Sequence, residues 1–495
     1  MSGIGIKLNY IYEKNTIITR LIGAGYSVSI TIAPLLVVIG TLALMMKTLG
    51  FSSVAYASRE LFASTVMYIF IFALVSSAPF NAVLSKYLSD IIFEEKFEDI
   101  LPCFYIGLLL NVSFSCILGI PFCLWEYFVG HVDLVFVFTG FCGYISLVLA
   151  LYTMLYLSIC KDYFKVTLFY IIGLMITFIT SIILVYVFSW DIAYSMLFSL
   201  TIGFFIIACL GRAVINSYFR TNSHKYRRVF SYFRIYWKLV LANFTYIIGL
   251  FIHNFVFWTT DLRMVVAHSF VSAEAYDMAS CLAMFTNISA SVIFVSRVEM
   301  NFHFRYKIYS EAIIGGKLAD IEKAKKRVFR QMASELMDLT RIQFIISICL
   351  YIAFVVILPQ FGFSGMVMRI YPCLAAGYFI LFLMYSSIIF LYYFNDLTGS
   401  LMTSLSFLVM TFAGSILATH LSDIWYGIGL FLGAFCGWVV SYFRLRWLEQ
   451  NIDTHIFCKG ELLKKGDGKK PNEMVFRRYK PKWRLFNIRR KEKSC

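Results

Sequence analysis

The sequence predicts an all-α integral membrane protein whose twelve transmembrane helices form two six-helix lobes. Hydrophobic residues make up 60% of the chain and charged residues only 15%, whereas soluble proteins carry about a quarter charged residues. Apolar stretches that approach the roughly 20 residues needed to cross a bilayer core recur along the whole chain. The Lys and Arg residues fall almost entirely on one side of the topology that these stretches define.

The predicted spans follow one another with almost no room for a soluble domain between them. They cover residues 24–46, 61–84, 101–123, 134–159, 166–189, 192–215, 238–258, 278–296, 342–359, 372–394, 399–420 and 424–443. Six spans lie on each side of a basic connection near the middle of the chain. Such an arrangement is typical of transporters built from two related bundles.

The distribution of basic residues predicts the orientation. Of the 44 Lys and Arg residues, 40 lie on the same side of the twelve-span topology, and the other four are Lys47, Arg59, Arg263 and Arg369. Basic residues stay preferentially on the cytoplasmic side of short loops. We therefore expect a multi-pass membrane protein with both termini in the cytoplasm.

The same topology divides the chain into segments. We expect a cytoplasmic arm at 1–23, an N-terminal lobe at 24–215, a basic linker at 216–237, a C-terminal lobe at 238–447 and a basic tail at 448–495. In the tail, aromatic residues alternate with Lys and Arg, which suits an anionic lipid surface. Nucleic acid could be bound by the same composition, but the tail adjoins a bilayer, so lipid is the expected partner.

The one long inside loop, 297–341, has the pattern of a helical hairpin. Phe302, Tyr306 and Tyr309 recur at helical spacing before Gly315 and Gly316 interrupt the pattern, and a second amphipathic run follows. We expect the hairpin on the membrane surface or under the helices. It serves either as a docking surface for a cytoplasmic partner or only as a solvated, orientation-setting loop.

The sequence has no hallmark of an enzyme or a metalloprotein. It lacks the HExxH, GxxxxGK[ST] and GxSxG patterns, and its 12 Cys residues form no metal-binding spacing. No catalytic residue, cofactor or metal is predicted. An enzyme would have to use residues held inside the membrane.

Polar side chains within spans are costly and tend to face a bundle interior or a water-filled path. The candidates for a translocation path are Pro34, Asn81, Asn111, Asn243, His253, Asn254 and Asn287. Pro34 is expected to kink the first helix. His253 could take up a proton or act as the general base of an intramembrane acyltransferase. Hydrogen bonds between helices are the competing explanation for His253 and for the asparagines.

A charged cluster follows the seventh span on the predicted outer side. It contains Asp261, Arg263, Glu274 and Asp277. Surface charges are normally solvated, and this is the expectation here.

Several short motifs are distinctive, among them the opening Ser2-Gly-Ile-Gly-Ile-Lys-Leu, the later Phe257-Trp258 and Tyr276-Asp277-Met278. They resemble the PelG family of exopolysaccharide export, which is related to the MATE-like flippase superfamily. The most specific stretch continues from Val295-Ser-Arg297-Val-Glu299 to Tyr306-Lys-Ile-Tyr309. The match covers roughly residues 1–457 and leaves the tail outside it.

The resemblance implies a MATE-like translocator of the bacterial cytoplasmic (inner) membrane that passes a growing hexosamine-rich polysaccharide outward. Implied partners are a cytoplasmic glycosyltransferase that uses a UDP-sugar, and other membrane subunits of Pel type, including a cyclic di-GMP receptor. Because the longest inside loop contains the strongest motif, Arg297, Glu299, Arg305 and Tyr306 are the residues we expect to couple the chain to the synthase. A lipid-linked oligosaccharide flippase of the same fold is the alternative.

Overall fold

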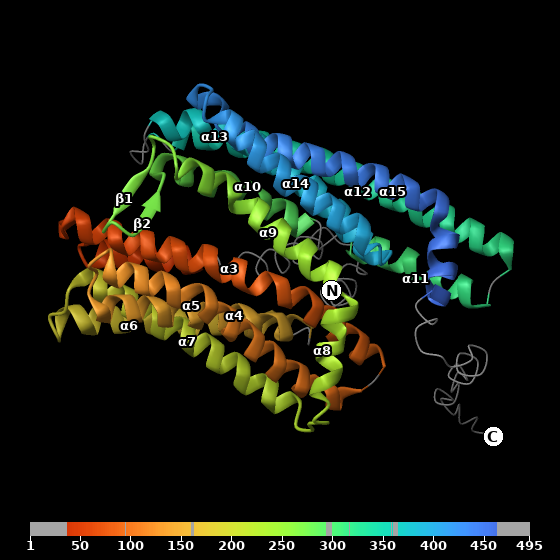
Figure 1. Ribbon diagram of the computed structural model, residues 1–495, viewed down its shortest axis with the longest axis horizontal. Helices are drawn as coiled ribbons and strands as arrows, with labels where there is room; N and C mark the ends of the chain where they lie inside the picture. Colours follow the sequence, from red (N-terminus) through yellow and green to blue (C-terminus); the bar gives the residue numbers. More distant parts are fainter. Residues whose placement is uncertain are drawn as a thin grey trace, which may run out of the picture. The chain divides into compact units, whose positions relative to one another are not determined.

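The computed structural model describes residues 37–94, 96–159, 163–293, 299–315, 317–357, 359 and 365–462. Within these ranges, ten helices are long and apolar enough to cross a membrane. They are α3 (Tyr56–Phe93), α4 (Ile100–Phe128), α5 (Leu134–Ile159), α6 (Tyr163–Tyr186), α7 (Ile192–Tyr218), α9 (Trp237–Phe257), α12 (Leu318–Ile357), α13 (Gly365–Tyr393), α14 (Leu397–Ala418) and α15 (Ile428–Leu462) (Figure 1). The predicted helical membrane architecture is therefore confirmed.

Ten such helices are fewer than the twelve spans that the sequence predicts. The shorter helix Val37–Thr48 covers the end of the first predicted span, whose earlier part and Pro34 lie outside the described residues. α10 (Glu274–Ile293) covers most of the eighth predicted span. Its composition, which includes Glu274, Asp277 and several serines, is too polar for it to belong to the ten apolar helices.

A two-stranded hairpin departs from the predicted all-α fold. β1 (Met264–Val266) pairs antiparallel with β2 (Phe270–Ser272) in the segment expected to be an outer loop. Val265 and Val271 face each other at its centre, and β-branched residues favour strands. The strands are three residues long, too short for the pattern to be recognised among apolar helices. Figure 1 shows the hairpin beside the start of α3.

Helices α3 to α7 form an N-terminal group with its own apolar core. α5 packs on α3 and α7, and α6 packs on α7. Met196, Leu200 and Phe204 of α7 are buried in this core. Gly173 of α6 and Gly203 of α7 allow the last pair to approach closely, because a Cβ on Gly173 would lie 2.9 Å from the Gly203 carbonyl oxygen.

Helices α9, α10, α12, α13 and α14 form a C-terminal group. α9 packs on α14, and α10 and α12 pack on α13. Residues 428–442 of α15 lie against α14 through small residues, since a Cβ on Gly433 would lie 2.7 Å from the backbone nitrogen of Thr411. The core of this group also takes in Tyr68 and Ile71 of α3. α3 therefore joins the two groups, and it contacts α9 as well.

The segment between α10 and the ninth predicted span contains two helices. α11 (Glu299–Gly315) packs on α12, which runs unbroken from Leu318 through the predicted boundary at residue 341 to Ile357. In the apolar 18-residue stretch of α12, only 6% is buried, against 72% in the corresponding stretch of α13. The apolar part of α12 thus lies at the edge of the described helices, where its exposed side chains suit lipid.

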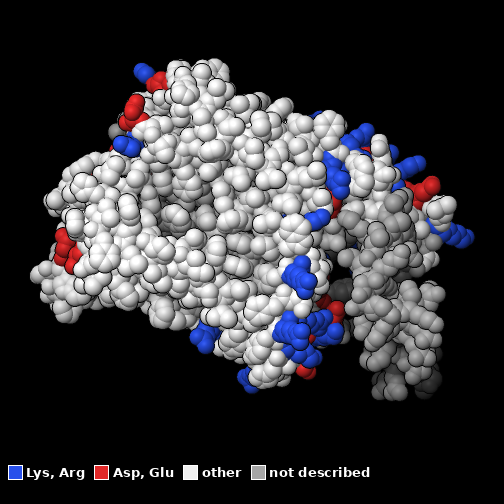
Figure 2. Space-filling view, in the orientation of Figure 1, with Lys and Arg blue, Asp and Glu red and all other residues white. Residues whose placement is uncertain are grey.

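The basic residues gather at one end of the helices. Figure 2 shows Lys and Arg concentrated where α8 (Tyr226–Ile235) and α11 lie in Figure 1, with few at the end that carries the hairpin. The second compact unit, residues 443–495, contains the end of α15, with a break from helical geometry at Asn451. The basic stretch 463–495 lies outside the described residues.

Candidate functional site

Tyr68 joins the two helix groups at the end of the molecule that carries the hairpin. Its hydroxyl donates to the Val271 carbonyl oxygen at 2.8 Å and accepts from the Val271 amide at 3.0 Å. The backbone N–H and carbonyl groups of Val271 at the strand edge thus find their hydrogen-bond partner in a side chain of α3, 203 positions away in sequence. Because a single hydroxyl serves both backbone groups of Val271, a small separation of α3 from the hairpin would break both bonds.

Aromatic rings enclose this contact. The Tyr68 ring stacks on Trp258, the residue that follows α9, with centroids 5.2 Å apart and planes 9° from parallel. Phe270 of β2 meets the other rings edge-on, 5.0 Å from Tyr68 and 5.4 Å from Phe122 of α4. Aromatic pairs at such distances stabilise beyond the area they bury. The two groups are therefore sealed together by a small, largely apolar cluster.

Asp277 supports the seal from the C-terminal side. Its carboxylate accepts from the Trp258 indole at 3.0 and 3.1 Å, from the Asn254 amide at 2.7 Å and from the Ala273 backbone amide at 2.9 Å. It lies in the first turn of α10, where the helix dipole favours negative charge. The expectation of a solvated charge holds for the exposed Asp261, Arg263 and Glu274, but not for Asp277, which is partly buried and engaged with three residues.

His253 occupies the core of the C-terminal group. It is fully buried, and its Nδ1 lies 2.9 Å from the Tyr276 hydroxyl. Tyr378 lies edge-on to its ring, with its own hydroxyl 3.0 Å from Ser280. The contact with Tyr276 is a bond between α9 and α10, the structural alternative that the sequence left open. The Nε2 atom is buried and has no hydrogen-bond partner among the described residues.

The asparagines proposed for a path do not gather in one place. Asn243 donates to the Tyr392 hydroxyl at 3.2 Å, a bond between α9 and α13, and Asn111 donates to the Gly107 carbonyl within α4. The side-chain oxygen of Asn81 is buried without a partner in the described structure. Only Asn254 belongs to the seal around Tyr68. Asn287 is part of α10, but its side chain is not among those described.

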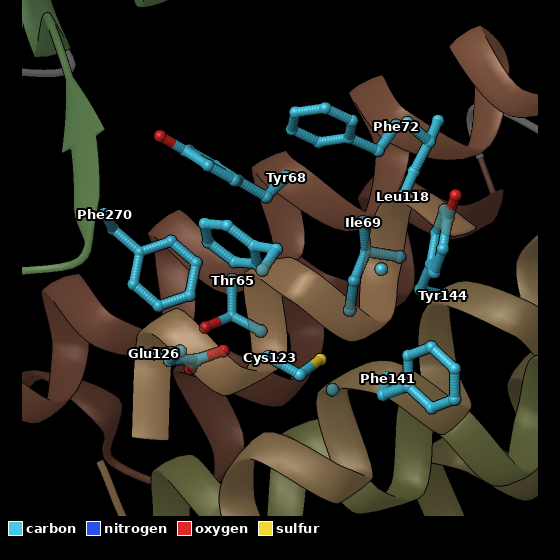
Figure 3. A pocket seen from close by; sticks show the side chains of 13 residues that line it. Thr65, Tyr68, Ile69, Phe72, Leu118, Cys123, Glu126, Phe141, Tyr144 and Phe270 are labelled. Carbon is cyan, nitrogen blue, oxygen red and sulfur yellow. The ribbon is translucent and has the colours of Figure 1, made fainter. Parts of the chain in front are cut away.

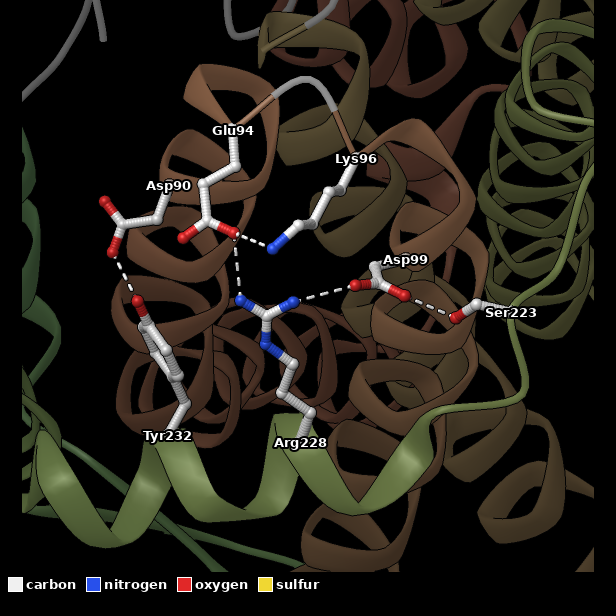
Figure 4. A network of polar contacts seen from close by, with 7 residues as sticks. All are labelled: Asp90, Glu94, Lys96, Asp99, Ser223, Arg228 and Tyr232. Atoms are coloured by element: carbon white, nitrogen blue, oxygen red, sulfur yellow. Dashed lines mark hydrogen bonds and ion pairs between the residues drawn. The ribbon is translucent and has the colours of Figure 1, made fainter. Parts of the chain in front are cut away.

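A second polar cluster lies at the basic end, where α8 contacts α3 and α4 (Figure 4). The Arg228 guanidinium bridges Asp99 at 2.9 Å and Glu94 at 3.1 Å, and Lys96 donates to Glu94 at 2.6 Å. Hydrogen bonds from Lys96 and then Arg228 hold the pKa of Glu94 below its usual range. Asp99 is only 2% exposed, so Arg228 neutralises a buried carboxylate.

Two hydroxyls complete this cluster. Ser223 donates to Asp99, and Tyr232 donates to Asp90 of α3. Burial, followed by the bond to Asp90, raises the pKa of Tyr232. The linker helix α8 is thereby fixed to the N-terminal group through residues that the sequence did not single out.

The residues proposed for partner coupling are only partly described. Arg297 lies outside the described residues, and Glu299 begins α11 with its side chain undescribed. The Tyr306 ring packs on Tyr393 and Phe394 near the end of α13, at 6.0 and 5.9 Å. Arg305 lies 6.0 Å from the Phe304 ring, which is exposed. Tyr306 therefore contributes to packing within the chain, whereas Phe304 presents an exposed ring.

The fold is that of a multi-pass membrane transporter. An outward-facing multidrug resistance MATE family transporter of the MOP superfamily aligns with it at 14% identity and a TM-score of 0.55, covering 85% of this chain and 96% of that one. A MOP superfamily transporter from Pyrococcus furiosus aligns at 13% identity and a TM-score of 0.57, covering 86% and 96%. At these identities the likeness shows the fold alone.

The sequence comparison defines the family. The profile of PelG, described as "Putative exopolysaccharide Exporter (EPS-E)", matches residues 1–457, and the chain belongs to this family. The resemblance inferred from the motifs is therefore confirmed. A search of curated proteins gives no significant match.

Sequence reasoning overlooked most of the seal around Tyr68. Trp258, Tyr276 and Asp277 were noticed as parts of family motifs, but nothing in the sequence connected them with Tyr68 or Phe270. The available signal was an acidic residue, Asp277, directly before the predicted span 278–296 and next to Tyr276. It became meaningful only once α3 was placed against the hairpin.

Proposed function

We propose that this protein passes a growing hexosamine-rich exopolysaccharide across the cytoplasmic membrane while a cytoplasmic glycosyltransferase extends it from a UDP-sugar. The observation that carries the proposal is the match to the PelG exporter family over residues 1–457, on a fold shared with MATE-type transporters. Both indicate a transporter rather than an enzyme. The proposal includes twelve spans in two lobes, with the helix Val37–Thr48 and α10 as parts of two further spans.

The charge distribution supports an orientation. The end that carries α8 and α11 holds the gathered Lys and Arg of Figure 2, and such residues are retained on the cytoplasmic side. We place this end and both termini in the cytoplasm. The hairpin and the seal around Tyr68 then lie at the outer face.

In this orientation the seal is an outer gate. The two helix groups are held together there by the bonds between Tyr68 and Val271 and by the stack on Trp258. Passage of a polymer to the outside requires these contacts to separate, because the rings exclude any chain of sugars. Transport by alternating opening of two ends needs a closed state of this kind.

Locking the gate tests the proposal. Tyr56 of α3 and Met264 of β1 are in contact, 3.5 Å from hydroxyl to sulfur, and Tyr56 is 59% exposed. In cells that depend on this chain for export, Tyr56→Cys with Met264→Cys is treated with a reducible bismaleimide. We expect secreted polymer to fall at least tenfold and to recover on reduction, whereas each variant with only one of the two substitutions continues to export. Unchanged secretion by the cross-linked protein would show that this junction does not open during transport.

Co-purification separates the two transport hypotheses. The synthase-coupled exporter should retain a soluble glycosyltransferase, and synthesis in vesicles should place polymer in the compartment opposite the UDP-sugar. Other membrane subunits, including a cyclic di-GMP receptor, are expected in the same complex. A lipid-linked oligosaccharide flippase would work without a bound glycosyltransferase. Export of preformed lipid-linked oligosaccharide by the purified chain would favour that alternative.

A further inference from the structure

A cavity of about 70 Å³ lies directly beside the outer gate (Figure 3). α3, α4 and α5 form its walls, and Phe270 of the hairpin contributes one side. The lining side chains are mostly aromatic or aliphatic: Tyr68, Ile69, Phe72, Leu118, Phe122, Phe141, Tyr144 and Phe270. A space of this size holds a few water molecules, but it is too small for a sugar ring.

One carboxyl group opens onto this apolar space. Glu126, in the last turn of α4, is 4% exposed, and its Oε1 atom is buried without a hydrogen-bond partner among the described residues. Figure 3 shows the carboxyl group near Cys123, Thr65 and Phe270. The Thr65 hydroxyl is already used, because it donates to the Leu61 carbonyl at 2.7 Å. Unlike Asp277, the Glu126 carboxyl group therefore has no hydrogen-bond donor arranged around its Oε1 atom in the described part of the chain.

Among the described residues, the groups that face Glu126 supply no positive charge. The other titratable side chains that line the cavity are Tyr68 of α3, Cys123 of α4 and Tyr144 of α5, all neutral at physiological pH. The hairpin contributes Phe270 to the lining, and His131 and His268 on the neighbouring loops are exposed. An isolated ionised carboxylate is highly unfavourable in such surroundings. A cation must accompany the carboxylate while the cavity stays closed.

We propose that Glu126 is a cation-binding site of the outer gate, which holds one proton or one sodium ion in the closed state and releases it outward when the hairpin separates from α3. Tyr68 and Phe270 belong both to the gate and to the cavity wall. Opening the gate removes that wall and admits water. The water can then solvate the ionised carboxylate of Glu126. This inference rests on the proposed function for its direction.

By linkage, a ligand that binds only the closed state stabilises that state. Cation loss from Glu126 then favours an open gate, and cation binding favours closure. Sodium and a proton differ in the number of oxygen ligands that each requires. Sodium would need several oxygen ligands, which the ring-lined cavity scarcely offers, whereas a proton needs only the carboxyl group itself. The geometry therefore favours the proton.

A labelling experiment on the wild-type protein tests the site without any variant. Dicyclohexylcarbodiimide is an apolar reagent that reacts with protonated carboxyl groups. The full chain in lipid nanodiscs is labelled and mapped by mass spectrometry, with Glu60 and Glu274 as internal references. We expect Glu126 to react at least tenfold faster than either and to react more slowly as the pH rises. Protection of Glu126 by sodium chloride, but not by choline chloride, would assign sodium as the bound cation. Labelling no faster than the references would overturn the proposal.

Hydrogen exchange of the hairpin tests the coupling to the gate. Exchange of a peptide covering 264–272 is compared between the wild type and Glu126→Gln at the same pH, so the intrinsic exchange rate cancels. We expect equal exchange at pH 5 and about tenfold faster exchange in the wild type at pH 9, because only the wild type can ionise. Glu60→Gln, which removes a carboxylate outside the cavity, should match the wild type.

Equal exchange of the wild type and Glu126→Gln across the pH range, with and without sodium, would show that Glu126 does not control the gate. Neither measurement requires polymer or a glycosyltransferase. A failure of the export proposal would leave both readouts intact, and a failure of these readouts would leave the export assay unaffected.

Discussion

The outer gate and the polar cluster of Arg228, Glu94 and Asp99, here named the linker cluster, join their helices by different physical means. At the gate, Tyr68 and Trp258 stack and the Tyr68 hydroxyl bonds to the Val271 backbone, so contacts between neutral groups cross from one helix group to the other. At the basic end, Arg228 pairs with Glu94 and Asp99. Those ion pairs hold the linker helix α8 to the N-terminal group and do not cross to the C-terminal group.

This difference suits a moving junction and a fixed one. Neutral aromatic contacts can separate and reform without leaving unpaired charges behind. Separating Arg228 from the buried Asp99 would leave an uncompensated charge, which is strongly unfavourable. We therefore expect α8 to move with the N-terminal group, while the Tyr68 junction opens. The predictions that follow test this contrast, from the largest expected effect to the smallest.

Removing the Asp277 carboxylate should have the largest effect. In Asp277→Ala, the Trp258 indole, the Asn254 amide and the Ala273 backbone amide all lose their acceptor. Hydrogen bonds to charged groups are among the stronger ones, so a loss of roughly 3 kcal/mol in the free energy of unfolding is expected. Thermal unfolding in nanodiscs measures it. Asp261→Ala, an exposed charge nearby, is the matched control, and an equal effect of the two would contradict the structural role of Asp277.

Breaking the linker cluster should have the next largest effect. Arg228→Ala leaves Asp99 buried without its ion pair, although Arg228 itself is 36% exposed. Because solvent screens part of the interaction of this partly exposed arginine, we expect a loss of roughly 2 kcal/mol in the free energy of unfolding. Arg227→Ala, on the same helix but exposed, should lose little. Hairpin exchange should be unchanged in Arg228→Ala; accelerated exchange there would show that the two ends are coupled through α8.

A matched pair of tyrosines separates the moving junction from the fixed one. Tyr68→Phe removes the hydroxyl that bonds to Val271, and Tyr232→Phe removes the one that bonds to Asp90. Each variant should lower the free energy of unfolding by roughly 1 kcal/mol, which is the typical net contribution of one intramolecular hydrogen bond. Only Tyr68→Phe should accelerate hydrogen exchange at the Val271 amide, by several-fold. Faster exchange at the Val271 amide in both variants would contradict the distinction between a moving and a fixed junction.

Acid should weaken the linker cluster slightly. The pKa of Glu94 is lower in the folded protein than its ordinary value of 4.5, so its ionised form stabilises the fold. That contribution is complete above pH 4.5 and is lost as the pH falls through the lower, folded pKa. The effect should be small because Glu94 is 41% exposed. Thermal midpoints of wild type and Glu94→Gln should converge as the pH falls from 4.5 through the lower, folded pKa of Glu94, and a constant difference would contradict this assignment.

The candidate gate could be predicted from the sequence only in fragments. His253 and Asn254 were recognisable as polar residues in an apolar span, and Trp258 and Asp277 as parts of motifs. Their partners were not recognisable, because hydrogen bonds between α9 and α10 or between α3 and β2 depend on which helices pack together. Asn243 illustrates the same point, since its bond to Tyr392 joins positions 149 residues apart.

The sequence by itself determined the helical membrane class, the family and the one-sided distribution of basic residues. These features depend on local composition, since about 20 consecutive apolar residues suffice for a span. Tertiary structure alone decided that Asp277 is engaged rather than solvated, that Tyr68 bonds to Val271, and that Glu126, whose Oε1 atom has no partner among the described residues, faces a cavity. The identity of an acidic residue does not reveal its surroundings. Only the packing around it determines whether water, hydrogen-bond donors or aromatic rings surround its charge.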